Sequence, residues 1–144
     1  MDFVLDTNIV ISALITPNGT ISKLILNDLS KSRMICPEFL FEELISKFDK
    51  IKQITGLKTD QLTELLFRFI KHIDFVDDNL IERKYKKQAY DLVKEIDKKD
   101  VLFVALSLQT GFTLWTGDKK LASGLIRIGF NQVIETKQLL ELKD

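Results

Sequence analysis

Acidic residues stand at three places where a short apolar segment of this chain meets polar residues. Asp6 follows the run FVL, Asp118 stands three residues after the end of the run FTLW, and Asp100 precedes the segment VLFVALSL. Two carboxylates about 4 Å apart repel by about 4 kcal/mol at an effective dielectric constant near 20, so clustered acids stay ionised only around a cation. Mg²⁺ and Mn²⁺ prefer oxygen ligands, and Mg²⁺ commonly shares them with substrate phosphates. These acids predict phosphoryl chemistry at a divalent-metal site if the fold brings them together.

Each of the three aspartates also has a simpler interpretation. Asp is a preferred residue at the start of a helix, where its carboxylate accepts a backbone N–H bond and contributes about 0.5 to 2 kcal/mol. Asp6, Asp100 and Asp118 all precede segments that we expect to be helical. Any one of them could therefore serve only as a helix cap.

A fourth acid comes from the pair Glu42 and Glu43, which lies too far into its expected helix to act as a cap. At 100° per residue, Glu42 falls on an entirely polar stripe, whereas Glu43 falls at the margin of the apolar face. A side chain at that margin can reach over the edge of a sheet, which favours Glu43 as a metal ligand. The alternatives are that Glu42 is the ligand, or that Glu43 merely pairs with Lys47 one turn later. The apolar face is defined by Leu40, Phe41, Leu44, Phe48 and Ile51.

The elements that must position these acids alternate along the chain. Apolar segments predict strands at residues 2–5, 33–36, 72–76, 112–115 and 132–135. Helical periodicity or capping residues predict helices at 20–30, 37–48, 59–70, 84–96, 100–109, 119–128 and 137–142, with Pro37 at the first position of the second. Apolar strands that alternate with helices are typical of a parallel sheet covered on both faces. We expect a compact, doubly wound α/β fold of about five parallel strands, forming one domain over residues 1–144.

Composition excludes several other classes of site. A single cysteine, Cys36, excludes an internal disulfide and any zinc site built on several cysteines, and His72 is the only histidine.

The 21 basic and 21 acidic residues give a formal net charge of zero, although lysines cluster at 84–87, 98–99 and 119–120. The acidic start MDFVLD does not resemble a signal peptide, and no apolar run approaches the ~20 residues that span a membrane. We expect a soluble cytoplasmic protein.

The candidate acids lie in four segments: VLDTNIVISAL, PEFLFEELISKF, IDKKDVLFVALSL and LWTGDKKL. Together these segments resemble the acidic motifs of the PIN-domain family, and they occur in the family's order. The resemblance covers residues 1 to about 140, and PIN domains are compact α/β nucleases, many of them ribonuclease toxins of toxin–antitoxin pairs. It implies that Asp6, Glu43, Asp100 and Asp118 hold the metal, with Asn8, Thr116 and Asp97 in support. It also implies an antitoxin protein partner and a homodimer.

The resulting hypothesis is an endoribonuclease that uses Mg²⁺ or Mn²⁺ to activate water for attack on phosphorus. Single-stranded or looped RNA would be the substrate, because its backbone can bend into a crevice. Lysines beside the acids would steer phosphate toward the metal: Lys98, Lys99, Lys119 and Lys120.

Two alternatives lead to other functions. The chain could be a PIN-like binding module that has lost catalysis, although none of the acids is missing. FVLDTNIV also resembles the strand-borne nucleophile of haloacid dehalogenase-like phosphatases, but Asn8 stands where that family has its second acid. A receiver domain fits less well, since it needs paired acids after the first strand.

Overall fold

The computed structural model describes residues 1–143 and contains one five-stranded sheet with the strand order β3-β2-β1-β4-β5. Every neighbouring pair of strands is parallel. The strands are β1 (Phe3–Leu5), β2 (Met34–Pro37), β3 (Asp74–Val76), β4 (Thr113–Trp115) and β5 (Val133–Ile134). The prediction of an α/β fold with about five parallel strands is confirmed.

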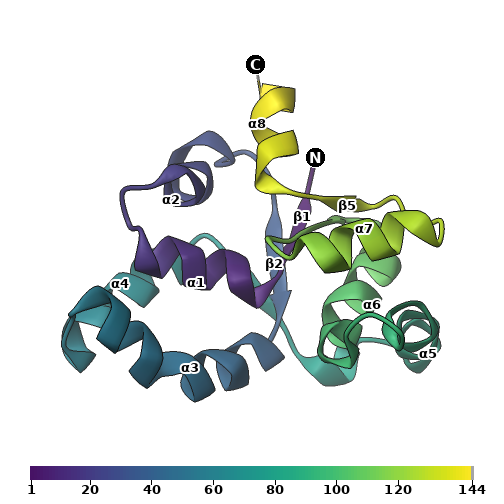
Figure 1. Cartoon of the computed structure of the whole chain (residues 1–144), viewed down its shortest axis with the longest axis horizontal. Coiled ribbons are helices and arrows are strands. Elements are labelled where there is room, and N and C mark those ends of the chain that lie inside the picture. Colours follow the sequence, from purple (N-terminus) through teal and green to yellow (C-terminus); the bar gives the residue numbers. More distant parts are fainter. Residues whose placement is uncertain (144) are drawn as a thin grey trace.

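Helices cover both faces of this sheet. Figure 1 shows α1, α3 and α4 on one side of the strands and α5 and α6 on the other, with α6 between the sheet and α5. The α-helices are α1 (Thr7–Ile15), α2 (Thr20–Lys23), α3 (Phe39–Thr55), α4 (Thr59–Ile70), α5 (Arg83–Val93), α6 (Val101–Thr110), α7 (Lys119–Arg127) and α8 (Thr136–Lys143). Shorter helical turns are η1 (Leu24–Asp28), η2 (Asp78–Leu80) and η3 (Lys98–Asp100). No single helix within residues 1–143 has the length and apolar character to cross a membrane; α1 and the segment Thr20–Asp28 would suffice together, but a 110° bend separates them.

The strand order reverses beside β1, and this reversal creates the position of the site. From β1 the chain proceeds to β2 and β3 on one side, then returns through α5 and α6 to β4 on the other side. In an open parallel sheet, such a switch point separates the loops at the carboxyl ends of the central strands and leaves a crevice there. Asp6 directly follows β1 and Asp118 follows β4. The topology therefore brings both acids to the same crevice.

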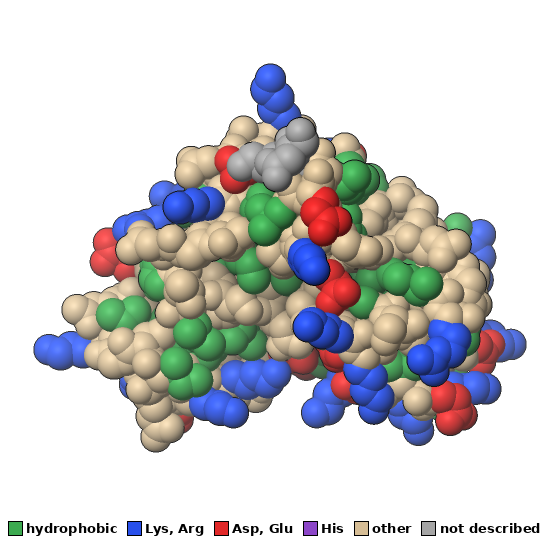
Figure 2. All heavy atoms as spheres, turned by 45° about the horizontal axis from the view of Figure 1, so that its top comes forward, with side chains coloured by type: hydrophobic (Ala, Val, Ile, Leu, Met, Phe, Trp, Pro, Cys, Tyr) green, Lys and Arg blue, Asp and Glu red, His purple; other side chains and the backbone are tan. Residues whose placement is uncertain are grey.

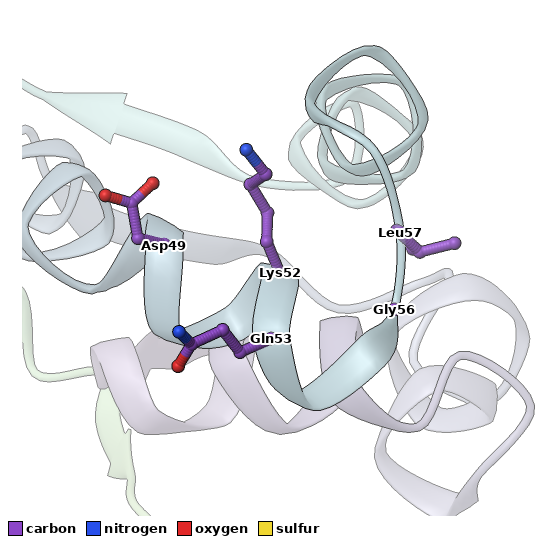
Figure 3. Close-up of a pocket in the computed structure, with 5 residues that line it drawn as sticks. All are labelled: Asp49, Lys52, Gln53, Gly56 and Leu57. Carbon is purple, nitrogen blue, oxygen red and sulfur yellow. The ribbon is translucent and has the colours of Figure 1, made fainter.

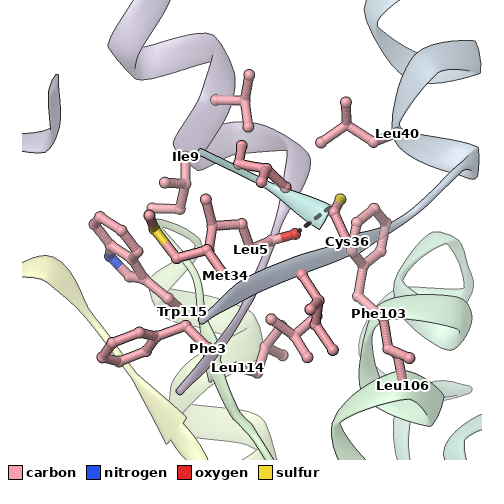
Figure 4. Packing of buried hydrophobic residues seen from close by; sticks show 14 of the residues in the cluster. Phe3, Leu5, Ile9, Met34, Cys36, Leu40, Phe103, Leu106, Leu114 and Trp115 are labelled. Atoms are coloured by element: carbon pink, nitrogen blue, oxygen red, sulfur yellow. Dashed lines mark hydrogen bonds between the residues drawn. The ribbon is translucent and has the colours of Figure 1, made fainter. Parts of the chain in front are cut away.

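The core is built on the central strands, whose side chains are buried on both faces. Phe3, Leu5 and Trp115 are each no more than 1% exposed, and the rings of Phe3 and Trp115 meet edge to face at 6.1 Å. Cys36 lies in the same core, where its thiol donates to the carbonyl of Leu5 at 3.3 Å (Figure 4). Burial raises the pKa of this thiol well above its ordinary value. Cys36 is therefore a core residue in this structure.

Two boundaries expected near the second strand and the helix after it are wrong. Pro37 is the last residue of β2 and not the first of a helix, because the Glu38 N–H donates to Val76 at 2.9 Å and extends the sheet bonding beyond the proline. The helix then continues past Phe48 to Thr55, with Ile51 buried, and ends at Gly56, whose φ of 72° is left-handed.

The helix expected at residues 20–30 also differs from the structure. It is regular only over Thr20–Lys23 and then widens into the π-helical turn Leu24–Asp28, in which the Leu29 N–H donates to the Leu24 carbonyl at 2.9 Å. A π-turn keeps roughly the same apolar spacing as an α-helix over so few residues, so periodicity does not distinguish the two.

Candidate metal centre

Three hydrogen bonds hold the backbone N–H and the carboxylate of Asp6 at the end of β1. Its backbone N–H donates to the Trp115 carbonyl at 3.1 Å, which continues the pairing of β1 with β4. Its Oδ1 accepts the backbone N–H of Asn8 at 3.2 Å and so caps α1, while its Oδ2 accepts the Thr116 hydroxyl at 2.5 Å. Asp6 is only 3% exposed. The carboxylate is both a helix cap and a fixed acid at the carboxyl end of β1.

Thr116 connects the ends of the two central strands through one hydroxyl group. This hydroxyl donates to Asp6 and accepts the backbone N–H of Asp118 at 3.0 Å. Asp118 in turn uses its Oδ1 to accept the Leu121 N–H at 3.1 Å, which caps α7. The capping interpretation is thus correct for Asp6 and Asp118, but a cap occupies only one carboxylate oxygen of each residue. The second oxygen of Asp118 stays available to a ligand.

Asp100 does not cap a helix with its side chain. It precedes α6, yet its carboxylate accepts no N–H bond from that helix, and its Oδ2 is buried without a hydrogen-bond partner among the described residues. Burying a carboxylate oxygen without a hydrogen-bond partner costs free energy, so this oxygen indicates a ligand that the protein alone does not supply. Asp97, three residues earlier, caps η3 by accepting the Lys99 N–H at 3.0 Å.

Asp97, Asp100 and Asp118 form a compact acidic group. Each offers one carboxylate oxygen, and these oxygens all lie within 4.8 Å of one another. The donors are oxygens only, which is the set that Mg²⁺ and Mn²⁺ prefer. The turn η3 is what brings Asp97 and Asp100 together, since it places both at the start of α6. These residues fit a hard divalent cation.

The electrostatics of the site also favour a cation. Burial and, after it, the charges of the surrounding acids, Asp6 first, together raise the pKa of Asp100 to about 8. The pKa of Asp6 is raised by burial and, more weakly, by Glu43 and Asp118, although its bonds to Thr116 and Asn8 oppose this. A divalent cation among the carboxylates would reverse the repulsion and keep them ionised at neutral pH.

Glu43 extends the acidic group from α3. Its Oε1 accepts the hydroxyl of Thr7 at 2.6 Å, and Thr7 is itself buried at the start of α1. Glu42 is exposed, as the helix phase predicts, and makes no such bond to the neighbouring helix. The two glutamates border a hollow of about 310 Å³ beside the acids. The residues that line this hollow are Phe39, Glu42, Glu43, Ser46, Lys47 and Lys99.

The structure arranges the expected site residues in two groups. Asp100 and Asp118 lie in the compact group, which also includes Asp97, whereas Asp6 and Glu43 lie close enough to act on Asp100 through their charges. Asn8 contributes its backbone N–H, and its side chain is exposed. The four lysines expected to contact RNA are all exposed: Lys98, Lys99, Lys119 and Lys120.

Sequence reasoning missed Thr7 as a residue that orients the site. The only signal was a hydroxyl residue directly after Asp6, and that gives no indication of contact with Glu43, 36 positions away.

The volume of a surface hollow is a poor guide to this site. A larger hollow of about 510 Å³ lies at the end of α3, where Asp49 and Lys52 border it together with Gln53, Gly56 and Leu57 (Figure 3). It has a single acid and lies apart from the acidic group.

Solved structures with this fold include two DNA-bound protein complexes. The first is VapBC2 from Rickettsia felis bound to a DNA fragment from its promoter, with a TM-score of 0.72 and 19% identity over 94% of this chain and 98% of that one. The second is DNA-bound VapBC from Salmonella typhimurium, with a TM-score of 0.71 and 17% identity over the same shares. PAE2754 from Pyrobaculum aerophilum has a TM-score of 0.68 and 12% identity over 99% of this chain and 89% of that one. At these identities the likeness shows the fold.

The family follows from a direct match of the sequence. The family model described as PIN domain matches residues 4–141, which is nearly the whole chain. A comparison with curated proteins finds no match. The chain belongs to the PIN-domain family, a family of nucleases. The expected resemblance is confirmed, and the acids described above lie within the matched residues.

Proposed function

We propose that this chain is an endoribonuclease that depends on Mg²⁺ or Mn²⁺ and cleaves single-stranded or looped RNA. The observation that carries the proposal is the buried Oδ2 of Asp100, which has no partner within residues 1–143 and lies where the other acids converge. An acid in that position is stable in its ionised form only beside a cation. Together with membership of a nuclease family, this supports metal-dependent phosphodiester hydrolysis.

In this proposal Asp97, Asp100 and Asp118 hold the metal, with Asp6 and Glu43 completing the negative charge of the site. A bound Mg²⁺ or Mn²⁺ lowers the pKa of water and offsets the charge that develops on the phosphate. The protein's own hydroxyl groups position the acids. The Thr116 hydroxyl fixes Asp6 and the backbone of Asp118, and the Thr7 hydroxyl fixes Glu43.

The surface around the acids suits a phosphate backbone. Lys47 and Lys99 line the hollow beside Glu43, and exposed Lys98, Lys119 and Lys120 are sequence neighbours of the acids. In Figure 2 the lower margin of the molecule is notched, with acidic side chains in the notch and basic side chains on both sides of it. Basic residues there attract RNA, while the acids require a cation before phosphate can approach.

A haloacid dehalogenase-like phosphatase is disfavoured by the surroundings of Asp6. That chemistry needs an accessible carboxylate as nucleophile. Asp6 is 3% exposed, and its two oxygens accept the Asn8 N–H and the Thr116 hydroxyl. A PIN-like module without catalysis remains the alternative, and it predicts no cleavage despite the intact acidic group.

We further propose that the chain is the toxin of a toxin–antitoxin pair and acts in the cytoplasm. The support is its family together with the two VapBC complexes of similar fold. The proposal includes an antitoxin protein partner and a homodimer, and it treats residues 1–144 as one domain, although residue 144 lies outside the described residues. Co-expression with the product of the adjacent gene, followed by a growth assay, tests the toxin role. Relief of growth arrest by that product is expected, and growth unaffected by the chain alone would contradict the role.

The nuclease proposal is tested by cleavage of an end-labelled single-stranded RNA with Mn²⁺, with and without EDTA. We expect cleavage only with the metal, and a 5′-phosphate on the downstream product, because water attacks phosphorus and the 3′ oxygen leaves. Asp100→Asn should abolish cleavage. The matched control is Asp49→Asn, which makes the same change in the hollow of Figure 3 and should retain activity. A 2′,3′-cyclic phosphate product would contradict the mechanism, because it requires attack by the RNA's own 2′-OH.

A further inference from the structure

Helix α5 carries a basic face that the acidic site does not use. At 100° per residue, Arg83, Lys87, Tyr90 and Lys94 lie within about 60° of one another around the helix axis. All four are exposed, and Tyr90 is 42% exposed even though it is aromatic. The opposite side of the helix is buried at Ala89. We call Arg83, Lys87, Tyr90 and Lys94 the α5 stripe.

The first turn of α5 concentrates this positive charge. A hollow of about 700 Å³ is lined by Arg83, Lys84, Lys86 and Lys87, so every lining residue is a cation. Within residues 1–143, none of the three cations of the α5 stripe forms an ion pair. Basic side chains predominate at the lower right of Figure 2, over the region where Figure 1 places α5. The positive charge of the stripe is therefore available to an anionic partner.

The α5 stripe leads toward the acidic site. At its start, the Glu82 N–H donates to Gln109 at 2.7 Å, which joins the beginning of α5 to the end of α6. Since α6 begins beside Asp100 and Gln109 lies at its other end, the start of α5 is the end of the stripe remote from the acids. At the carboxyl end of α5, the Asp97 N–H donates to the Val93 carbonyl at 2.9 Å. The turn after α5 therefore places Asp97, a member of the acidic group, next to the end of this helix.

The dimensions of the stripe suit a short length of nucleic acid. Arg83 and Lys94 are eleven residues apart, so the stripe is about 16 Å long at a rise of 1.5 Å per residue. Stacked nucleotides advance about 3.4 Å along a strand, so this length accommodates about five of them. The exposed ring of Tyr90 stands between the cations, and an aromatic ring among basic residues is the arrangement on which unpaired bases stack.

We propose that the α5 stripe is a track for single-stranded RNA that leads to the acidic site. Arg83, Lys87 and Lys94 contact successive phosphates, and Tyr90 stacks on one base. Asp91 flanks the stripe and repels phosphate, which confines the strand to the basic face. The inference rests on the proposed function for its role in cleavage, whereas its binding step stands on the charge and the geometry of α5 alone.

The binding test uses the triple variant Arg83→Gln, Lys87→Gln and Lys94→Gln. Fluorescence anisotropy with a labelled 20-nucleotide RNA in EDTA measures affinity without cleavage. We expect binding about 10- to 100-fold weaker than that of the wild type, and a slope of log affinity against log salt that is smaller by about 2, at ~0.7 per phosphate contact. The matched control is the triple variant of exposed lysines Lys23→Gln, Lys31→Gln and Lys50→Gln, which should bind as the wild type does.

Tyr90 gives an independent readout of stacking. Tyr90→Ala should weaken binding several-fold, and Tyr90→Phe should restore it, because phenylalanine keeps the ring and loses only the hydroxyl. Equal RNA binding by the wild type and the α5 triple variant would overturn the track, and would leave an acidic protein segment as the partner of this face. Loss of binding equal to that of the control triple variant would also overturn it, since net charge alone would then explain the effect.

Cleavage separates this inference from the proposed function. With Mn²⁺, the α5 triple variant should raise KM for the 20-nucleotide RNA about tenfold and leave kcat unchanged, while a four-nucleotide RNA is cleaved as by the wild type. If the wild type binds through the stripe but cleaves no RNA, the nuclease proposal fails and the track stands. If the wild type cleaves and the triple variant has an unchanged KM, the track fails and the nuclease proposal stands.

Discussion

The hydroxyl of Thr116 donates to Asp6 across the ends of the two central strands, at 2.5 Å. The same hydroxyl accepts the Asp118 N–H at 3.0 Å, so one buried group sets the positions of two acids from opposite halves of the chain. A short, charge-assisted hydrogen bond of this kind restrains both partners more strongly than a neutral one. Thr116 is therefore the structural link between the sheet and the acidic site.

Replacing Thr116 with valine should damage the site while retaining its shape. Thr116→Val leaves a buried oxygen of Asp6 without its donor, and we expect it to reduce the free energy of unfolding by about 1 to 3 kcal/mol. Mn²⁺ affinity should fall about 10- to 100-fold, the usual effect of losing a group that orients a ligand. Urea denaturation and metal titration measure the two effects. Thr116→Ser keeps the hydroxyl and serves as the control; an equal loss in both variants would show that packing, not the hydrogen bond, matters.

The two glutamates of α3 should differ sharply in function. Glu43→Gln removes a charge that lies close to Asp6 and Asp100, and we expect cleavage to fall about 10- to 100-fold. Glu42→Gln makes the same change one residue away on an exposed side chain and should stay within about twofold of the wild type. Initial rates on one RNA at fixed Mn²⁺ give the comparison. If Glu42→Gln is the impaired variant, the assignment from helix phase is incorrect.

Stability without metal should depend on pH through Asp100. Its pKa of about 8 in the folded protein lies above the value of 3.8 for the free side chain. The folded state therefore binds the proton more tightly, so this stabilisation is complete below about pH 4 and is lost as the pH rises toward about 8. Urea unfolding in EDTA, measured from pH 5 to pH 9, should show this decline. Asp100→Asn should flatten the curve, and an unchanged slope in that variant would exclude Asp100 as its source.

The sheet and the meeting of the acids at its edge could be predicted because both follow from simple rules. Residues such as Phe3 and Leu5 are buried on both faces, which makes β1 a continuous apolar run. Parallel strands place their carboxyl ends on one edge, so Asp6 and Asp118 had to lie near each other. The margin position of Glu43 likewise followed from the 100° period of α3.

Other features of the site depend on local geometry that residue types do not reveal. The turn η3 brings Asp97, rather than Asp6, into the compact acidic group. Asp97 lies between the helices expected at 84–96 and 100–109, where periodicity predicts no side-chain direction. Asp118 uses one carboxylate oxygen to cap α7 and leaves the other for a ligand, and its residue type does not reveal this division. The contact of Thr7 with Glu43 joins residues far apart in sequence and has no periodic signature.

The central claim is that these acids bind a divalent cation, and thermal unfolding with and without Mn²⁺ tests it most directly. At 100 times the dissociation constant, binding to the folded state adds about 2.7 kcal/mol, which should raise Tm by about 5 to 10 °C in a chain of this size. Asp49→Asn should show the same rise, and Asp100→Asn should show almost none. No rise in the wild type, or an equal rise in Asp100→Asn, would contradict the account.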